Sequence, residues 1–241
     1  ADAWAMNTHR SLHPSFGPGR PALRFEPVIT LGDGDVRAHE AIAGSGPRVG
    51  FGMTEGGAFE YLLDRVAERV ARWTDGAAVS MNVTLAQLLD PELPRHIAGA
   101  ADRAGVAPAR FLLEIDATAA ERDPAGARMA VERLHADAWS ITLDRIEDAV
   151  TPLRTLCFLP VDLVKIDQTA VAEASRDRLE ALTATATTAR RRGIATVATG
   201  IGTLPELAAA IAHGYDFAQG PLFGEQIPAP RIRGEATGPT Q

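Results

Sequence analysis

Seven polar side chains in this sequence stand at the ends of short, otherwise apolar segments. They are Glu40, Asn82, Glu114, Asp144, Lys165, Thr199 and Gln219. Three carboxylates and an amide that converge at one place offer the oxygen ligands that Mg²⁺ and Mn²⁺ prefer. One polar residue at a strand end is ordinary, because the chain emerges into solvent there. Seven together predict a site, ancestral or present, without predicting that it is active.

The segment WSITLDRIED, residues 139–148, contains a negative and a positive side chain next to each other, Asp144 and Arg145. A buried strand over 139–143 would release Asp144 at its tip, which is a good position for a metal ligand. Arg145 follows at once, and a guanidinium repels a second metal ion strongly at close range in a partly buried site. Arg145 could instead turn away, or pair with one of three neighbouring carboxylates: Asp144, Glu147 or Asp148.

The elements that would position these residues alternate along the chain. Eight short segments rich in Val, Ile, Leu and Phe are predicted to be strands: 23–31, 36–42, 77–83, 110–116, 139–144, 161–167, 193–199 and 215–219. Longer amphipathic segments between them are predicted to be helices, among them 59–73, which ends at Asp75-Gly76, and a helix opened by the capping box at Thr203.

This alternation predicts an α/β fold, a TIM-like (β/α)8 barrel. Only residues 32–35 separate the first two strands, too few for a parallel crossover, so we expect an antiparallel leading strand. The sites of such barrels lie at the carboxyl ends of the strands, where the seven polar residues fall.

The composition limits the classes of function. The net charge of −7 argues against holding nucleic acid by bulk electrostatics. Cys157 is the only cysteine, so an internal disulfide is excluded. We expect Cys157 to be a small buried apolar residue. No run approaches about 20 apolar residues, so we expect no membrane span and a cytoplasmic protein. Residues 1–22 and 229–241 have the composition of linkers or tails around a barrel domain at 23–228, and the chain is compatible with a piece of a larger protein.

Several motifs resemble those of the EAL domain, the phosphodiesterase module that linearises cyclic di-GMP, over about residues 23–228. The clearest are Leu159-Pro160-Val161-Asp162 leading to Lys165-Ile166-Asp167, and Gln219-Gly220-Pro221-Leu222-Phe223. Weaker matches are Glu40-Ala41-Ile42, Asn82-Val83-Thr84 and Glu114-Ile115-Asp116-Ala117. The resemblance implies two-metal hydrolysis of a phosphodiester, with the first metal held by Glu40, Asn82, Glu114 and Asp144.

The sequence departs from the family pattern where that chemistry depends on it. The aspartate implied as a main ligand of the second metal is Arg145, and the glutamates of the Ala-Glu-Gly-Val-Glu motif are Thr199 and Gly202. The arginine implied to contact a substrate phosphate is Gly44, in a short glycine-rich loop over 43–57. The loop implied to couple dimerisation to the site has become 146–150. These losses predict room for a single metal ion at most.

The leading hypothesis is therefore a catalytically inactive EAL-like domain with a regulatory binding role in cyclic di-GMP-related signalling. Its partner would be a protein or a neighbouring domain; a homodimer is compatible with the sequence, and no cofactor is required beyond, at most, one Mg²⁺ or Mn²⁺. The alternatives are a cyclic di-GMP receptor that does not hydrolyse the nucleotide, in which Arg145 contacts a phosphate, and a residual metal-dependent phosphodiesterase. One interpretation of Lys165 and Gln219 is that they are catalytic remnants that order water and metal. The alternative for Lys165 is a cation that pairs with Asp144 or Glu114.

Overall fold

The computed structural model describes residues 23–43, 58–146, 155–156, 158–167, 176–224 and 227–228. Gly44 and Cys157 lie outside these residues, as do the segments 1–22, 44–57, 147–150 and 229–241, so the expectations about them stay predictions. The backbone of Arg145 is described as part of a strand, whereas its side chain is not.

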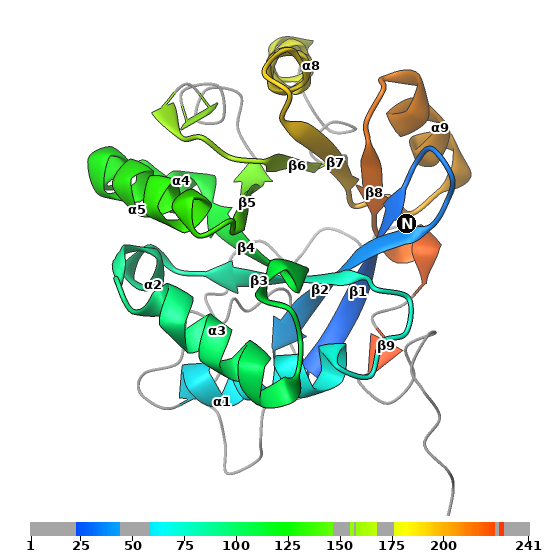
Figure 1. Cartoon of the computed structure of the whole chain (residues 1–241). Helices are drawn as coiled ribbons and strands as arrows, with labels where there is room; N and C mark the ends of the chain where they lie inside the picture. Colours follow the sequence, from blue (N-terminus) through cyan, green and yellow to red (C-terminus); the bar gives the residue numbers. More distant parts are fainter. Residues whose placement is uncertain are drawn as a thin grey trace, which may run out of the picture.

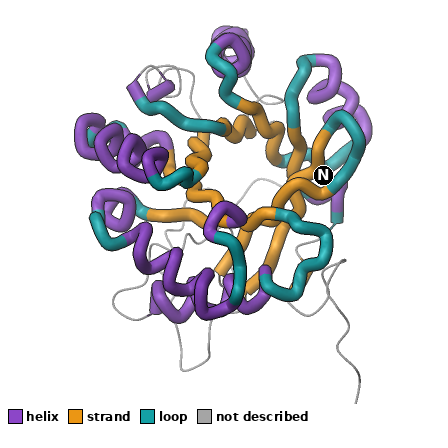
Figure 2. Tube along the Cα trace, in the orientation of Figure 1, coloured by secondary structure: helices purple, strands orange, loops and turns teal. Residues whose placement is uncertain are grey.

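Eight strands close into a barrel, which Figures 1 and 2 show along its axis. The strands are β1 Leu23–Thr30, β2 Val36–Ala43, β3 Ala78–Val83, β4 Phe111–Asp116, β5 Ser140–Ile146, β6 Leu163–Asp167, β7 Ala195–Thr199 and β8 Phe217–Gln219. The sheet runs in parallel from β2 through β8, and β1 closes it antiparallel to both β8 and β2. A short strand, β9 (Ile227–Pro228), pairs with the start of β1.

Helices surround the barrel and cover its outer face (Figure 1). They are α1 Ala58–Val70, α2 Leu85–Leu89, α3 Leu93–Ala104, α4 Ala117–Ala120, α5 Pro124–Ala136, α8 Arg176–Arg191 and α9 Leu204–Ala212, with short 3₁₀ turns η2 Pro108–Arg110 and η3 Pro221–Phe223. The predicted barrel and its antiparallel leading strand are confirmed. The structure adds β9, which two residues could not signal in the sequence.

Caps define the ends of several helices, and the capping box predicted at Thr203 is confirmed. Thr203 and Glu206 form a reciprocal capping box at the start of α9. Gly105 ends α3 in the left-handed conformation with φ of 69°, which a residue with a Cβ adopts at a steric cost. The predicted helix over 59–73 ends earlier, at Val70, and Trp73 instead packs in the turn that follows.

The two faces of each strand have opposite characters. Outward residues are apolar and buried beneath the helices, as Val79, Met81 and Val83 of β3 show. The alternate residues of the same strand, Ala78, Ser80 and Asn82, point into the barrel. The inward set therefore becomes more polar toward the carboxyl ends of the strands. This gradient places the polar residues at one end of the barrel.

An aromatic cluster packs the leading hairpin against α1. The Trp73 ring contacts Phe25 of β1 edge-on at 5.4 Å and His39 of β2 at 4.7 Å between ring centroids. The Arg110 guanidinium lies 5.9 Å from the Trp73 ring and donates hydrogen bonds to the carbonyl of Ala77. His39 is 4% exposed, and neither of its ring nitrogens has a hydrogen-bond partner among the described residues.

This cluster predicts acid sensitivity. Burial lowers the pKa of His39 below its usual 6.5, and the nearby Asp75 offsets part of that effect. The unfolded chain therefore takes up a proton near pH 6.5 that the folded protein resists, so stability falls as pH drops below that value. We expect His39→Leu to lose less stability between pH 7.5 and 5.5 than the wild type, measured by urea unfolding at both pH values. Equal losses in both proteins would contradict this, and the exposed His213→Gln is the control.

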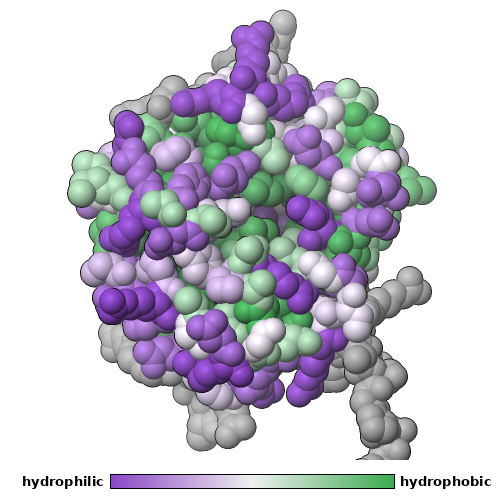
Figure 3. Space-filling view, viewed as in Figure 1, coloured by the Kyte–Doolittle hydropathy of each residue, from purple (hydrophilic) through white to green (hydrophobic). Residues whose placement is uncertain are grey.

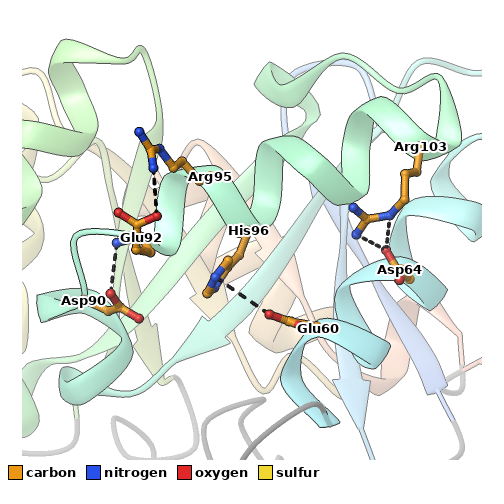
Figure 4. A network of polar contacts seen from close by, with 7 residues as sticks. All are labelled: Glu60, Asp64, Asp90, Glu92, Arg95, His96 and Arg103. Carbon is orange, nitrogen blue, oxygen red and sulfur yellow. Dashed lines mark hydrogen bonds and ion pairs between the residues drawn. The ribbon is translucent and has the colours of Figure 1, made fainter.

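Figure 4 shows polar contacts along α3, two of which join it to α1. Arg103 of α3 donates two hydrogen bonds to Oδ1 of Asp64 in α1, at 2.6 and 3.1 Å. His96 lies 3.7 Å from Glu60. These side chains are largely exposed to water, which screens their charges, so each pair contributes less than about 1 kcal/mol. Buried apolar contacts must therefore supply most of the stability of this helix pair.

Candidate functional site

The carboxyl end of the barrel brings together six of the seven predicted residues through direct contacts or shared charge, and five of them are almost fully buried. Glu40 (β2), Glu114 (β4) and Gln219 (β8) have no exposed surface, and Asp144 (β5) and Lys165 (β6) are 2% and 3% exposed. The parallel pairing of neighbouring strands aligns these inward positions, which is why residues up to 179 positions apart in the chain meet here.

Lys165 is the centre of this cluster and the only lysine in the 241 residues. Its Nζ lies 2.8 Å from Oε2 of Glu40 and 2.5 Å from Oε1 of Glu114. The sequence offered Asp144 or Glu114 as its partner; the structure records Glu114, together with Glu40. A single ammonium thus bridges the two buried glutamates.

Two side-chain amides complete the arrangement around the glutamates. The Nδ2 of Asn82 donates to Oε1 of Glu40 at 3.0 Å and more weakly to Oε2 of Glu114 at 3.4 Å. The Nε2 of Gln219 donates to Oε2 of Glu40 at 2.7 Å. Glu40 therefore accepts hydrogen bonds from three different strands, which fixes both of its oxygens.

The carboxylates are crowded, and this affects their protonation. Burial, with the neighbouring charges of Glu40 and Asp144, raises the pKa of Glu114 to about 7, although the Lys165 ammonium works in the opposite direction. One cation thus compensates only part of the negative charge at this end of the barrel. A divalent cation would reduce the repulsion between these carboxylates.

Asp144 sits at an irregularity in β5. The predicted strand over 139–143 extends in the structure to Ile146, so Asp144 lies inside the strand rather than after it. The pairing of β5 with β6 shifts register between Leu143 and Ile146, where two residues of β5 face one residue of β6. Such bulges redirect side chains near functional sites, and this one contains both Asp144 and Arg145.

Thr199 occupies the end of β7 and is 4% exposed. It pairs in register with Asp167 at the end of β6. The strand order β5-β6-β7 therefore places Arg145 and Thr199, two of the positions that depart from the family pattern, on either side of the strand that carries Lys165. Asp116, which also ends an inward stripe, instead caps α4 through the backbone N–H of Ala119.

Three inward residues near the cluster were missed in the sequence. Glu26 of β1 is 8% exposed and lies directly opposite Glu40 in the antiparallel pairing, so their Cβ atoms are within about 5.5 Å. Ser80 and Thr142 lie one inward position before Asn82 and Asp144 on β3 and β5. The alternation of residue types, read two residues back from Asn82 and Asp144, would have identified Ser80 and Thr142. Glu26 lies farther from the end of β1, and this reading would not have found it.

The donor set consists of ligands that suit a hard cation. Glu40, Asn82, Glu114 and Asp144 supply carboxylate and amide oxygens, which are the ligands of Mg²⁺ and Mn²⁺. Among the described residues no three His, Cys, Asp or Glu side chains are grouped in a metal-holding arrangement. Lys165 lies between Glu40 and Glu114 and contacts both. A cation at this place must share these oxygens with the ammonium.

Within the part of the chain that the structure describes, no helix has the length and apolar character needed to cross a membrane. The sequence matches the EAL domain family over residues 54–226. This match begins after β2 and so excludes Glu40, which the strand pairing nevertheless places in the cluster.

Curated relatives carry this region within longer chains. The bifunctional diguanylate cyclase/cyclic di-GMP phosphodiesterase MucR of Pseudomonas aeruginosa is 26% identical over 179 residues, which cover 72% of this chain and 26% of that protein. A signaling protein of Caulobacter vibrioides is 28% identical over 190 residues, covering 73% of this chain and 24% of the relative. The chain thus spans about a quarter of the length of each.

Solved structures share the fold. The EAL domain of Mycobacterium smegmatis DcpA superposes with a TM-score of 0.72 at 25% identity, over 87% of this chain and 94% of that one. The PaMucR phosphodiesterase in complex with c-di-GMP gives 0.73 at 23% identity, over 87% and 93%. Because the family match covers well over half of the 241 residues, the chain belongs to the EAL domain family.

Proposed function

We propose that this chain is an EAL-family domain that does not hydrolyse cyclic di-GMP and that acts by binding in cyclic di-GMP-related signalling. Its partner is a protein or a neighbouring domain of a longer chain. The observation that carries the proposal is Arg145, which follows the buried Asp144 in the bulge of β5. A fixed positive charge stands where the family resemblance implies a ligand of the second metal.

The electrostatics of the barrel end support this proposal. A divalent cation beside Asp144 would be repelled by the buried Lys165 ammonium and, at close range, by the positive charge of the neighbouring Arg145. Thr199 supplies a hydroxyl where the resemblance implies a carboxylate, so the attraction that would offset this repulsion is reduced. The chain therefore lacks the paired metal ions on which hydrolysis in this family depends.

The residues implied for the first metal fit one ion. Glu40, Asn82, Glu114 and Asp144 would hold it, and a divalent ion bound there would stabilise negative charge on a phosphate group. The chain's own residues then have defined tasks. Asn82 and Gln219 orient Glu40 through hydrogen bonds, and Lys165 balances the buried glutamates.

Hydrolysis of cyclic di-GMP with Mg²⁺ and with Mn²⁺ tests the proposal. We expect no linear dinucleotide above the background of a Glu114→Gln variant, because the second metal site is lost. The EAL domain of MucR, prepared in the same way, serves as the positive control. Metal-dependent production of the linear dinucleotide by the wild-type chain, absent from the variant, would refute the proposal.

A cyclic di-GMP receptor without hydrolysis is the second candidate, favoured by the surviving polar barrel end and by an arginine available for a phosphate. The glycine at position 44 argues against it, because the resemblance places a phosphate-binding arginine there. Calorimetry with the nucleotide, with and without Mg²⁺, separates the two candidates. Saturable heat that disappears in Arg145→Ala would favour the receptor, whereas no heat at high micromolar nucleotide would leave binding of a protein or domain as the function.

A further inference from the structure

The amino-terminal half of the barrel contains a cavity of about 260 Å³. Its lining comes from the inward face of every strand from β1 to β8, below the polar cluster. The strand ring that encloses it is seen along its axis in Figure 2. Figure 3, in the same orientation, shows hydrophobic residues toward the middle of this face among hydrophilic ones.

Small side chains account for this space. TIM-like barrels are usually filled by layers of bulky Val, Ile and Leu. Here Ala38, Ala78, Ser140 and Ala195 occupy inward positions of four different strands at this level. The volume exceeds the cavity of about 150 Å³ that holds benzene in an engineered protein, so it can accommodate a small organic molecule.

A buried hydroxyl faces this cavity and needs a partner. Ser80 lines the cavity, is 3% exposed, and its Oγ has no hydrogen-bond partner among the described residues. Leaving a buried hydroxyl without a hydrogen bond is unfavourable, so a molecule that hydrogen-bonds to Ser80 gains that interaction. Thr142 adds a second hydroxyl-bearing side chain to the wall.

The charges around the cavity select against a charged occupant. Its inner end is formed by Lys165 and Glu114, which already pair with each other at 2.5 Å. The exposed Arg37 lines the cavity as well. A charged occupant of either sign would lose its hydration in a mostly apolar space whose inner end is an ion pair that is already formed, and this loss costs free energy. The walls are otherwise mostly apolar, as at Leu112, Leu163 and Phe217.

We propose that this cavity is a binding site for a small neutral molecule with an apolar body and one hydroxyl group, which hydrogen-bonds to Ser80. The site lies toward the amino-terminal end of the barrel interior and meets the candidate metal ligands only at Glu114, which lines its inner end. The inference does not rest on the proposed function. A bound molecule would lie next to Lys165 and Glu114 at the inner end of the cavity, so its binding changes the surroundings of these two side chains.

Benzyl alcohol is a suitable probe, with toluene, benzoate and benzylamine as comparisons. Because Lys165 is the only lysine, lysine labelled with ¹³C or ¹⁵N gives a single reporter at the inner end of the cavity. We expect benzyl alcohol to shift the Lys165 signals saturably, and the two charged analogues to have no effect. No saturable shift with benzyl alcohol, or an equal response to benzoate, would overturn the proposal.

Two variants test the location. Ser80→Ala keeps the space but removes the hydroxyl, so it should weaken benzyl alcohol about fivefold while leaving toluene unchanged. Ala195→Leu fills the cavity and should abolish binding of both, whereas Ala208→Leu, at an exposed position of α9, should have no effect. If Ala195→Leu does not fold, Ser80→Ala still decides: unchanged affinity for benzyl alcohol would show that the molecule binds elsewhere.

Discussion

Replacing Lys165 with methionine is expected to lower the free energy of unfolding by about 3–5 kcal/mol, since removing one partner of a buried ion pair leaves an uncompensated charge. Lys165 is 3% exposed and lies within 2.8 Å of oxygens from two fully buried glutamates. Methionine fills a similar volume but brings no charge, so Glu40 and Glu114 would face each other without a cation. Urea unfolding at pH 7.5 measures the loss.

Arg103→Met is the matched control, because it also removes one positive charge and one ion pair. Arg103 pairs with Asp64 on the surface, where both side chains are largely exposed, so the expected loss is below about 1 kcal/mol. Losses of equal size in the two variants would contradict the central role of Lys165. The same experiment has a metal arm: Mn²⁺ should raise the melting temperature of Lys165→Met more than that of the wild type, because the ion takes the place of the ammonium.

The double substitution Arg145→Asp with Thr199→Glu is expected to create a second site for a divalent ion. It removes a positive charge next to Asp144 and adds two carboxylates at the ends of β5 and β7, on both sides of the Lys165 strand. We expect Mn²⁺ to bind this second site roughly 100-fold more tightly than it binds any second site in the wild type. The binding free energy that corresponds to this factor is smaller than the interaction energy of one close charge pair near a protein surface. Calorimetric titration with Mn²⁺ gives both the affinity and the number of ions.

Arg145→Ala is the control that separates repulsion from coordination. It removes the guanidinium without adding a ligand, so it should strengthen Mn²⁺ binding without adding a second ion. If the double variant still bound no more than one ion, residues other than Arg145 and Thr199 would be responsible for the loss of the second metal site. Hydrolysis is not expected from the double substitution alone, because position 44 still lacks the arginine implied for the substrate phosphate.

The barrel was predictable because its strands carry two signals at once. Segments such as 77–83 and 161–167 are short and mostly apolar, and longer amphipathic segments with recognisable caps, such as the one that Thr203 opens, lie between such strands. The distance between the first two strands dictated an antiparallel pairing without further information. The sequence pattern could not predict β9. A strand of only two residues forms because it pairs with a neighbouring strand, here β1, and its own composition carries no signal.

The site was predictable as a set of residues but not as a set of contacts. Strand ends identified Glu40, Glu114 and Lys165, and only the packed barrel shows that Lys165 bridges both glutamates. Glu26 was missed because β1 runs antiparallel, so its inward carboxylate lies near the cluster without standing at the end of its strand. The cavity was missed for a related reason, since it depends on several small residues that meet only when the barrel closes.

Counting the divalent ions at the barrel end tests the account most directly. Crystals of the wild-type chain grown with Mn²⁺ and cyclic di-GMP, measured at the manganese absorption edge, would locate each ion by its anomalous scattering. We predict at most one ion, held by Glu40, Asn82, Glu114 and Asp144, with no second peak beside Arg145. Two manganese peaks sharing Asp144 as a bridging ligand, with the Arg145 side chain turned away from them, would contradict the account.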